Sequence, residues 1–195
     1  MTEEVSRQMN RGWTTRDIMV TAIISIALGL IYIPLTYLTG WAMAFPLTMA
    51  LIMGIYYWPI IMMVYLIRKP GVALFSTAVS MLVAVPFTPW GISLLMHIIT
   101  IGLPLEIIFL AGRYKNFKLW YLLLAGAIAS LFSATLSFIM YGLANIDLLL
   151  QIVYFGGAAI SGAFLGGLLA KLIGDAVIKT GVISNAPVES EKQVE

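Results

Sequence analysis

The segment LLMHIITIGLPLEIIFLAG places two ionisable side chains, His97 and Glu106, inside an otherwise apolar run. A charged side chain at the centre of a bilayer costs about 3 kcal/mol on insertion scales, so such residues usually face a protein interior and mark a functional site. A carboxylate in these surroundings is suited to binding a cation or an amine. We therefore interpret Glu106 as the polar anchor of a pocket for a small cationic or amine-bearing molecule.

Helix geometry separates these two residues. Nine positions at about 100° each put His97 and Glu106 on opposite faces of one helix, so only one of them can face a central pocket. Gly102 lies one turn before Glu106 and leaves room for a ligand against the backbone. Pro104 deprives the carbonyl of Thr100 of its helical donor. These features favour the Glu106 face.

Each residue also has a structural interpretation. A lone imidazole in a chain with no second histidine and no cysteine is no metal site, so the alternative for His97 is a hydrogen-bonded structural histidine. The alternative for Glu106 is a buried carboxyl group that is kept neutral by burial or is paired with a tyrosine inside the bundle.

Aromatic side chains complete the candidate site. Trp58 stands beside the helix-breaking Pro59, at a depth comparable with that of Glu106, where an interfacial aromatic belt does not explain it. We expect Trp58 to stack on a flat ligand, together with rings and hydroxyls from Tyr56, Tyr57, Tyr141 and Tyr154.

The composition identifies the elements that position these residues as membrane helices. Of the 195 residues, 61% are hydrophobic and 10% are charged, whereas soluble domains have about 25% charged residues. About 20 apolar residues span a bilayer. We predict six spans, at residues 18–38, 42–67, 72–85, 90–111, 119–143 and 148–173, with a bend near Trp58-Pro59.

The predicted fold class is therefore an all-α integral membrane bundle of six helices. All eleven Lys and Arg residues lie before the first span, in the connections after the second and fourth spans, or at the end of the sixth span and beyond. The excess of basic residues in cytoplasmic loops places both termini in the cytoplasm. We expect a cytoplasmic segment 1–17, a transmembrane domain 18–180 and a disordered cytoplasmic tail 181–195.

Small residues recur every four positions in two spans, which lets membrane helices approach closely. In the sixth span the series from Ala158 to Gly174 is expected to pack inside the bundle. For Thr21, Ser25 and Gly29 of the first span, packing inside the bundle and contact with a partner protein are both open.

Several function classes find no support in the sequence. It contains no P-loop, no HExxH and no GxSxG motif, so we expect no enzymatic activity. We expect neither a metal site nor a cofactor, and a net charge of +2 is too small to indicate nucleic-acid binding.

Four segments together resemble the substrate-binding (S) components of energy-coupling-factor (ECF) transporters, in particular the YkoE-type proteins for thiamin and its hydroxymethylpyrimidine precursor. They are GWTTRDIMVTAIISIALGLIY, GIYYWPIIMMVYLIRKPGVAL, GLPLEIIFLAGRYKNF and ISGAFLGGLLAKLIGDAVIKTGV. The resemblance implies six helices in a bacterial-type plasma membrane and a complex with a coupling (T) protein and ABC-type ATPases. It also implies that Thr21, Ser25 and Gly29 dock on the T protein.

The ligand implied by the resemblance is thiamin or its precursor, bound with high affinity from the outside. We expect Glu106 to bind the aminopyrimidine. Glu106 lies only seven residues, about 10 Å of helix, before Arg113, whereas the pockets of S components open outward. The alternative is that Tyr141, Asn145 and Tyr154 hold the ligand nearer the outside. Two rival functions stay open: an S component for another ligand, and a stand-alone carrier for an organic cation.

Overall fold

The computed structural model describes residues 12–42, 46–140, 142–143 and 146–180. Every regular element in these ranges is a helix, so the predicted all-α class is confirmed. Five described segments are long and apolar enough to cross a membrane, and one apolar helix, Val72–Phe87, is shorter. The five are Thr15–Ala42, Thr48–Ile67, Gly91–Ala111, Leu119–Met140 and Leu148–Lys179. Together the six segments correspond to the six predicted spans.

Two spans are single helices, α2 (Thr15–Ala42) and α7 (Leu119–Met140). The others consist of several elements: α3 (Pro46–Ile52), η1 (Met53–Tyr56) and α4 (Trp58–Ile67); α5 (Val72–Ala84) and η2 (Val85–Phe87); η3 (Gly91–Met96), η4 (Ile98–Gly102) and α6 (Leu103–Ala111); and α8 (Leu148–Ser161), η6 (Gly162–Leu168) and α9 (Leu169–Lys179).

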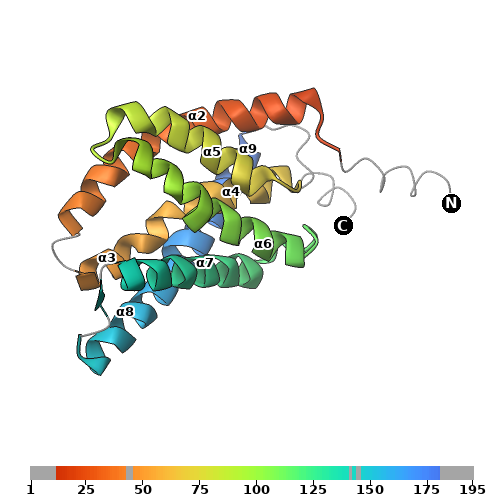
Figure 1. Cartoon of the computed structure of the whole chain (residues 1–195). Coiled ribbons are helices and arrows are strands. Elements are labelled where there is room, and N and C mark those ends of the chain that lie inside the picture. The colour runs from red at the N-terminus through yellow and green to blue at the C-terminus, as the bar shows by residue number, and fades with distance from the viewer. Residues whose placement is uncertain (1–11, 43–45, 141, 144–145, 181–195) are drawn as a thin grey trace.

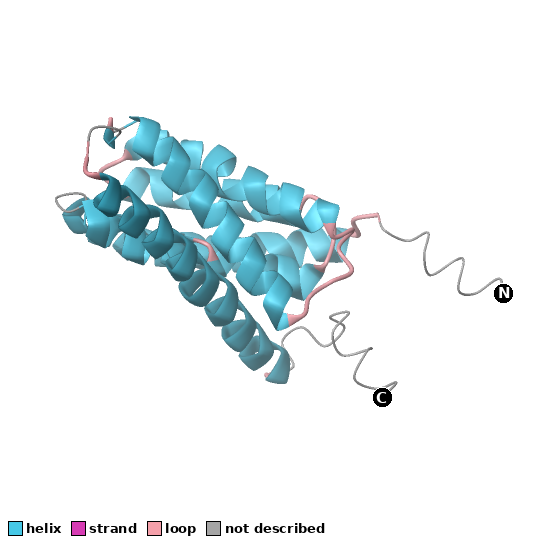
Figure 2. Ribbon diagram, turned by 90° about the horizontal axis from the view of Figure 1, so that it is seen from below, coloured by secondary structure: helices cyan, strands magenta, loops and turns pink. Residues whose placement is uncertain are grey.

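The start of α2 and the end of α9 lie at the same end of the bundle, together with the turns at residues 68–71 and 112–118 (Figure 1). Figure 2 shows this end from a second direction. The described Lys and Arg residues lie at or near this end because they occupy these turns and helix termini. The grouping of the basic connections at one end is thus confirmed, while the side of the membrane that this end faces stays a prediction.

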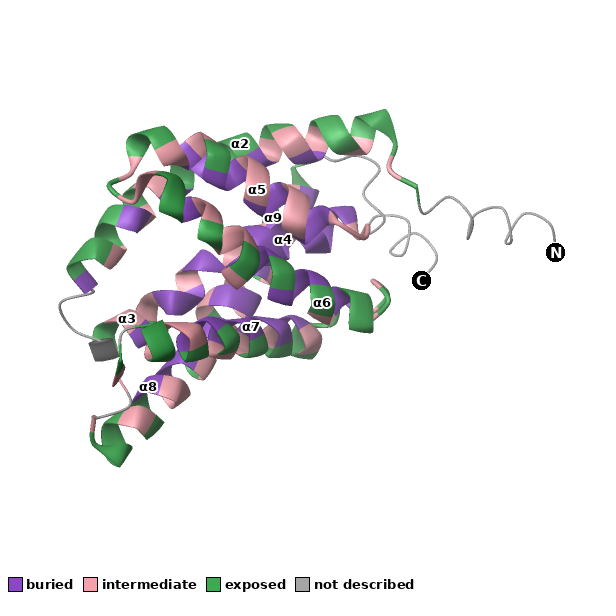
Figure 3. Cartoon of the chain, viewed as in Figure 1, coloured by how far each residue is buried: buried purple, intermediate pink, exposed green. Residues whose placement is uncertain are grey.

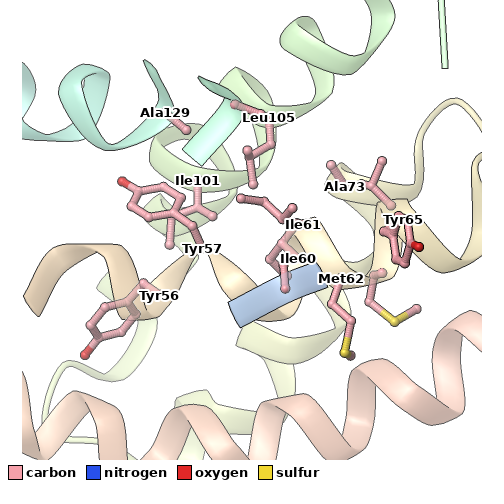
Figure 4. Packing of buried hydrophobic residues seen from close by; sticks show 14 of the residues in the cluster. Tyr56, Tyr57, Ile60, Ile61, Met62, Tyr65, Ala73, Ile101, Leu105 and Ala129 are labelled. Carbon is pink, nitrogen blue, oxygen red and sulfur yellow. The ribbon is translucent and has the colours of Figure 1, made fainter. Parts of the chain in front are cut away.

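Helix α4 forms the centre of the bundle. Its nine residues from Pro59 to Ile67 are all buried, whereas the other long helices are buried along one side only (Figure 3). Figure 4 shows Tyr57, Ile60 and Ile61 packed among side chains of neighbouring helices. A membrane helix that is apolar all round suits this position because it meets protein on every side.

Three of the six spans are interrupted within the membrane. The second contains the 3₁₀ turn η1 and restarts as α4 with Pro59 in its first turn, which confirms the predicted bend. The fourth and sixth contain π-helical turns, η4 and η6. Such turns leave backbone groups without regular helical partners, and in a membrane other protein groups must satisfy them.

Three buried serines bind backbone groups at these interruptions. Ser133 of α7 donates to the carbonyl of Thr100 at 2.7 Å, and Ser130 donates to the carbonyl of Ala158 at 2.7 Å. The hydroxyl of Ser161 accepts the amide of Gly54 at 2.9 Å. Pro104 was predicted to leave the Thr100 carbonyl without its helical donor, and Ser133 donates to this carbonyl from another span.

Glycines bring the sixth span into backbone contact with its neighbours. A Cβ atom on Gly126 of α7 would lie 2.1 Å from the carbonyl oxygen of Gly162, and one on Gly54 would lie 2.0 Å from that of Ser161. Neither position has room for any side chain. The prediction that the small residues of this span pack inside the bundle is confirmed.

The small-residue face of α2 also lies inside the bundle. Thr21, Ser25 and Gly29 are buried, and Ser80 of α5 donates to the carbonyl of Ser25 at 2.9 Å. A Cβ atom on Gly29 would lie 2.7 Å from the carbonyl oxygen of Ser80. This face is already covered by α5, so the structure favours the internal interpretation, and docking of these three residues on a partner stays an untested prediction that requires α5 to move.

Candidate functional site

Glu106 lies in the first turn of α6 and is 4% exposed. Its carboxylate accepts the backbone amide of Gly71 at 2.7 Å, the amide of Ala73 at 3.1 Å and the hydroxyl of Tyr114 at 2.5 Å. The structure therefore provides the pairing with a tyrosine that was the alternative to ligand binding.

These amides belong to the N-terminus of α5, which explains why a carboxylate is stable there. The first amides of a helix have no partner within the helix, and the helix dipole favours a negative charge beside them. The N-cap residue of α5 is Gly71, which has a left-handed conformation with φ of 89° and no side chain that could cap the helix. Glu106 supplies the cap from another span.

Tyr114 closes this arrangement from the loop after α6. Burial, and then its hydrogen bond to the Glu106 carboxylate, raise the pKa of Tyr114 above its ordinary value. The phenol therefore stays protonated, and remains a donor to Glu106, to a higher pH than an ordinary tyrosine.

Gly102 serves helix packing in this structure. A Cβ atom there would lie 3.1 Å from Oγ1 of Thr77 and 3.5 Å from the carbonyl oxygen of Ala73. The space that we expected to receive a ligand beside Gly102 is thus filled by α5. Gly102 and Glu106 do lie on one face, as predicted, and that face contacts α5.

The surroundings of Glu106 tie the basic end of the bundle together. Trp13 Nε1 donates to the carbonyl of Pro70 at 2.8 Å, next to the Gly71 amide that Glu106 binds. Lys69 binds the carboxylate of Asp17 at 2.5 Å and the carbonyl of Gly12 at 2.8 Å. The turn at residues 68–71 is thus held by α2 on one side and by Glu106 on the other.

His97 lies nine residues earlier, about 13 Å along the helix, in the opposite half of the same span. Its Nδ1 is 3.0 Å from the carbonyl oxygen of Leu94, as expected for a hydrogen-bonded histidine. Its ring centroid is 6.0 Å from that of Tyr56, which in turn stacks on Tyr32 at 5.9 Å. His97, Tyr56 and Tyr32 thus form one aromatic row, called the tyrosine–histidine row below.

Hydrogen bonds fix the tyrosines of this row. The Tyr56 hydroxyl donates to the carbonyl of Leu35 at 2.6 Å and lies 2.7 Å from the hydroxyl of Thr39. The Tyr32 hydroxyl donates to the carbonyl of Tyr56 at 2.6 Å. Tyr32 and Thr39 were not among the predicted site residues, although Tyr32, Thr36 and Thr39 recur at helical spacing along α2.

The other predicted aromatic residues that the structure describes are buried or half-buried. Tyr57 and Tyr154 are each 1% exposed, and the Tyr154 ring packs against Phe138 and Phe155 at 6.2 and 5.5 Å. Trp58 is half-buried against the core. Tyr141 and Asn145 lie outside the described residues. The structure thus brings together Tyr56 and His97 and separates them from Glu106 and Gly102.

No group of three or more His, Cys, Asp or Glu side chains that could hold a metal ion occurs among residues 12–180, the uncertain positions within that range aside.

Comparison with known proteins gives a consistent picture. Residues 16–132 match a family described as the permease component of an ABC-type cobalt transport system. The chain is 33% identical over 189 residues, 93% of its own length and 92% of the relative's, to a Bacillus subtilis (strain 168) protein named HMP/thiamine permease protein YkoE. A crystal structure of an S component of an ECF transporter superposes with a TM-score of 0.85 at 31% identity, covering 93% of this chain and 94% of that one.

Proposed function

The chain belongs to the S components of ECF transporters, in the YkoE-type family, and from this membership we propose that it captures thiamin or its hydroxymethylpyrimidine precursor for uptake. The observation that carries the proposal is the 33% identity to a relative named as an HMP/thiamine permease, which extends over 93% of the chain. Members of this family are multi-pass transporter components and not enzymes. Energy for uptake would come from a T component and ABC-type ATPases.

We propose that the ligand binds beside the tyrosine–histidine row. Thiamin carries a flat aminopyrimidine and a cationic thiazolium, and aromatic faces attract both by stacking and by cation–π interaction. Two hydrogen bonds hold the Tyr56 ring, which is 7% exposed, next to the His97 imidazole, so the ring that we propose the ligand contacts is already fixed in place. A preformed face of this kind loses little entropy when a ligand binds.

The positions of Glu106 and His97 support a ligand site beside His97 rather than beside Glu106. The three donors that bind Glu106 place it at the N-terminus of α5, beside the turn that contains Lys69, whereas His97 lies in the other half of the span Gly91–Ala111. If the basic end faces the cytoplasm, the tyrosine–histidine row lies toward the outside, where a captured vitamin arrives. Tyr141 and Asn145 follow α7 in the connection to α8 and remain predicted ligand contacts.

The test is a thermal-shift and calorimetric screen of the purified protein with thiamin, hydroxymethylpyrimidine and Co²⁺. A ligand at 100 times its Kd adds about 2.7 kcal/mol to the free energy of unfolding, which gives a clear rise in Tm. Stabilisation by either vitamin compound supports the proposal. Stabilisation by Co²⁺ alone would instead favour the substrate in the description of the matching family.

His97→Ala should weaken thiamin binding about tenfold, because it removes one polar contact and the imidazole ring of the tyrosine–histidine row. Ile99→Ala is the matched control, since Ile99 lies two residues away and is 50% exposed. It should leave the Kd within about twofold of wild type. Equal Kd values for His97→Ala and wild type would remove His97 from the site.

Transport assays distinguish an S component from a stand-alone carrier. Proteoliposomes that contain this chain alone should bind the vitamin without accumulating it, and accumulation should require the T component, the ATPases and ATP. Accumulation by the chain alone would contradict the proposal and support the carrier.

A further inference from the structure

Two serines of α7 donate hydrogen bonds to backbone carbonyls in or close before the two π-helical turns. Ser133 donates to the Thr100 carbonyl of η4, and Ser130 donates to the Ala158 carbonyl just before η6, both at 2.7 Å. The serines lie three residues apart on one face of a continuous helix, and they are 8% and 0% exposed. Helix α7 therefore fixes two interrupted spans through one hydroxyl each.

The two carbonyls differ in whether their own span also provides a backbone donor. The Ala158 carbonyl also accepts the amide of Gly162 in its own span, so the Ser130 hydroxyl is a second donor. Position 104, which would supply the equivalent amide to the Thr100 carbonyl, is a proline and has no N–H. Ser133 therefore provides a bond for which the fourth span has no regular helical donor.

The turn that Ser133 binds is joined directly to the tyrosine–histidine row. Helix turn η4 begins at Ile98, immediately after His97, and Thr100 lies three residues from the imidazole. The His97 ring packs on Tyr56, with 6.0 Å between the ring centroids. Tyr56 thus contacts His97 directly before η4, while Ser133 binds the Thr100 carbonyl within η4, so a shift of η4 would change how the His97 ring packs on Tyr56.

We propose that Ser133 is a positioning residue that sets the place of His97 against Tyr56 by holding the π-helical turn, and that ligand affinity depends on it although it does not touch the ligand. The part of this inference that concerns affinity rests on the function proposed above. The part that concerns His97 does not.

The single histidine of the chain allows a direct test without ligand. Protein labelled with ¹³C-histidine should give one set of imidazole resonances in detergent. Ser133→Ala should shift this set, Ser133→Thr, which keeps the hydroxyl, should leave it near the wild-type position, and Ser130→Ala should not move it. If Ser133→Ala is not recovered as monodisperse protein, Ser133→Cys, with a weaker donor, replaces it and should shift the resonances in the same direction.

Calorimetry with thiamin and hydroxymethylpyrimidine on the same variants gives the second measurement. Ser133→Ala should raise the Kd about tenfold, the equivalent of one lost hydrogen bond, with Ser130→Ala within about twofold of wild type. Imidazole resonances of Ser133→Ala that coincide with wild type, or an equal shift in Ser130→Ala, would overturn the inference. If wild-type protein binds neither compound, the proposed function fails, while the resonances still decide whether Ser133 positions His97.

Discussion

Replacing Glu106 by glutamine keeps the size of the side chain and changes what it offers to its three donors. Oε1 accepts the Gly71 amide and the Tyr114 hydroxyl, and Oε2 accepts the Ala73 amide. A glutamine has one acceptor oxygen. Its best orientation keeps the two bonds of Oε1 and turns the NH₂ group toward the Ala73 amide, so that two donors face each other.

The expected loss follows from these contacts. A hydrogen bond to a charged group contributes about 1.5–3 kcal/mol, and the Ala73 amide is buried without a substitute acceptor. We therefore expect Glu106→Gln to lower the free energy of unfolding by about 2–3 kcal/mol, which corresponds to a fall in Tm of about 5–10 °C. Tyr114→Phe removes one of the three donors and should cost about 1–2 kcal/mol.

The assay is thermal unfolding in detergent followed by tryptophan fluorescence, combined with calorimetry with thiamin well below the Tm of each variant. If Glu106 caps α5, both variants lose stability and folded Glu106→Gln binds thiamin within about threefold of wild type. A Glu106→Gln protein with an unchanged Tm and a lost affinity for thiamin would refute this reasoning and place Glu106 in the ligand site.

Two further predictions concern packing and pH. Gly54→Ala should abolish folding, because the added Cβ atom would lie 2.0 Å from the Ser161 carbonyl oxygen. The control is Gly156→Ala, whose Cβ atom would meet nothing within 4 Å and which should behave like wild type in size-exclusion chromatography. A monodisperse Gly54→Ala protein would contradict the packing of η1 on the sixth span. Because the pKa of Tyr114 is raised in the folded protein, the stability from its bond to Glu106 is complete below the ordinary tyrosine pKa of 10.0 and falls as the pH rises above it. The Tm of wild type should therefore drop toward that of Tyr114→Phe in alkaline buffer. Parallel curves of Tm against pH for the two proteins would contradict this prediction.

The spans and their interruptions could be predicted because they follow from local sequence. Hydrophobic runs gave six segments, and Pro59 indicated where the second would bend. The presence of Pro104 was enough to show that the Thr100 carbonyl lacks its helical donor; the structure shows that Ser133 donates to it. Ser133 could not be identified as that donor, since nothing in the sequence states that α7 lies beside η4.

The partners of the predicted site could not be derived for the same reason. Glu106 binds backbone amides 33 and 35 residues away, and an amide is present at every such position, so no residue type marks the contact. Gly102 indicated a close approach, and its neighbour proved to be Thr77 of α5. A polar residue in an apolar helix thus indicated the need for a partner without distinguishing a ligand from a helix terminus.

The unequal lengths of α2 and α5 have a consequence for the surrounding lipid. Helix α2 has 28 residues and is about 42 Å long, whereas its neighbour α5 has 13 residues and is about 20 Å long. A hydrocarbon core of about 30 Å is longer than α5 and shorter than α2. The perimeter of the protein therefore presents hydrophobic heights that differ from side to side, and the bilayer has to thin near α5 while α2 tilts or extends beyond it. Membrane thickness thus acts unevenly on this bundle, most strongly where α2 packs against the short span that contains α5.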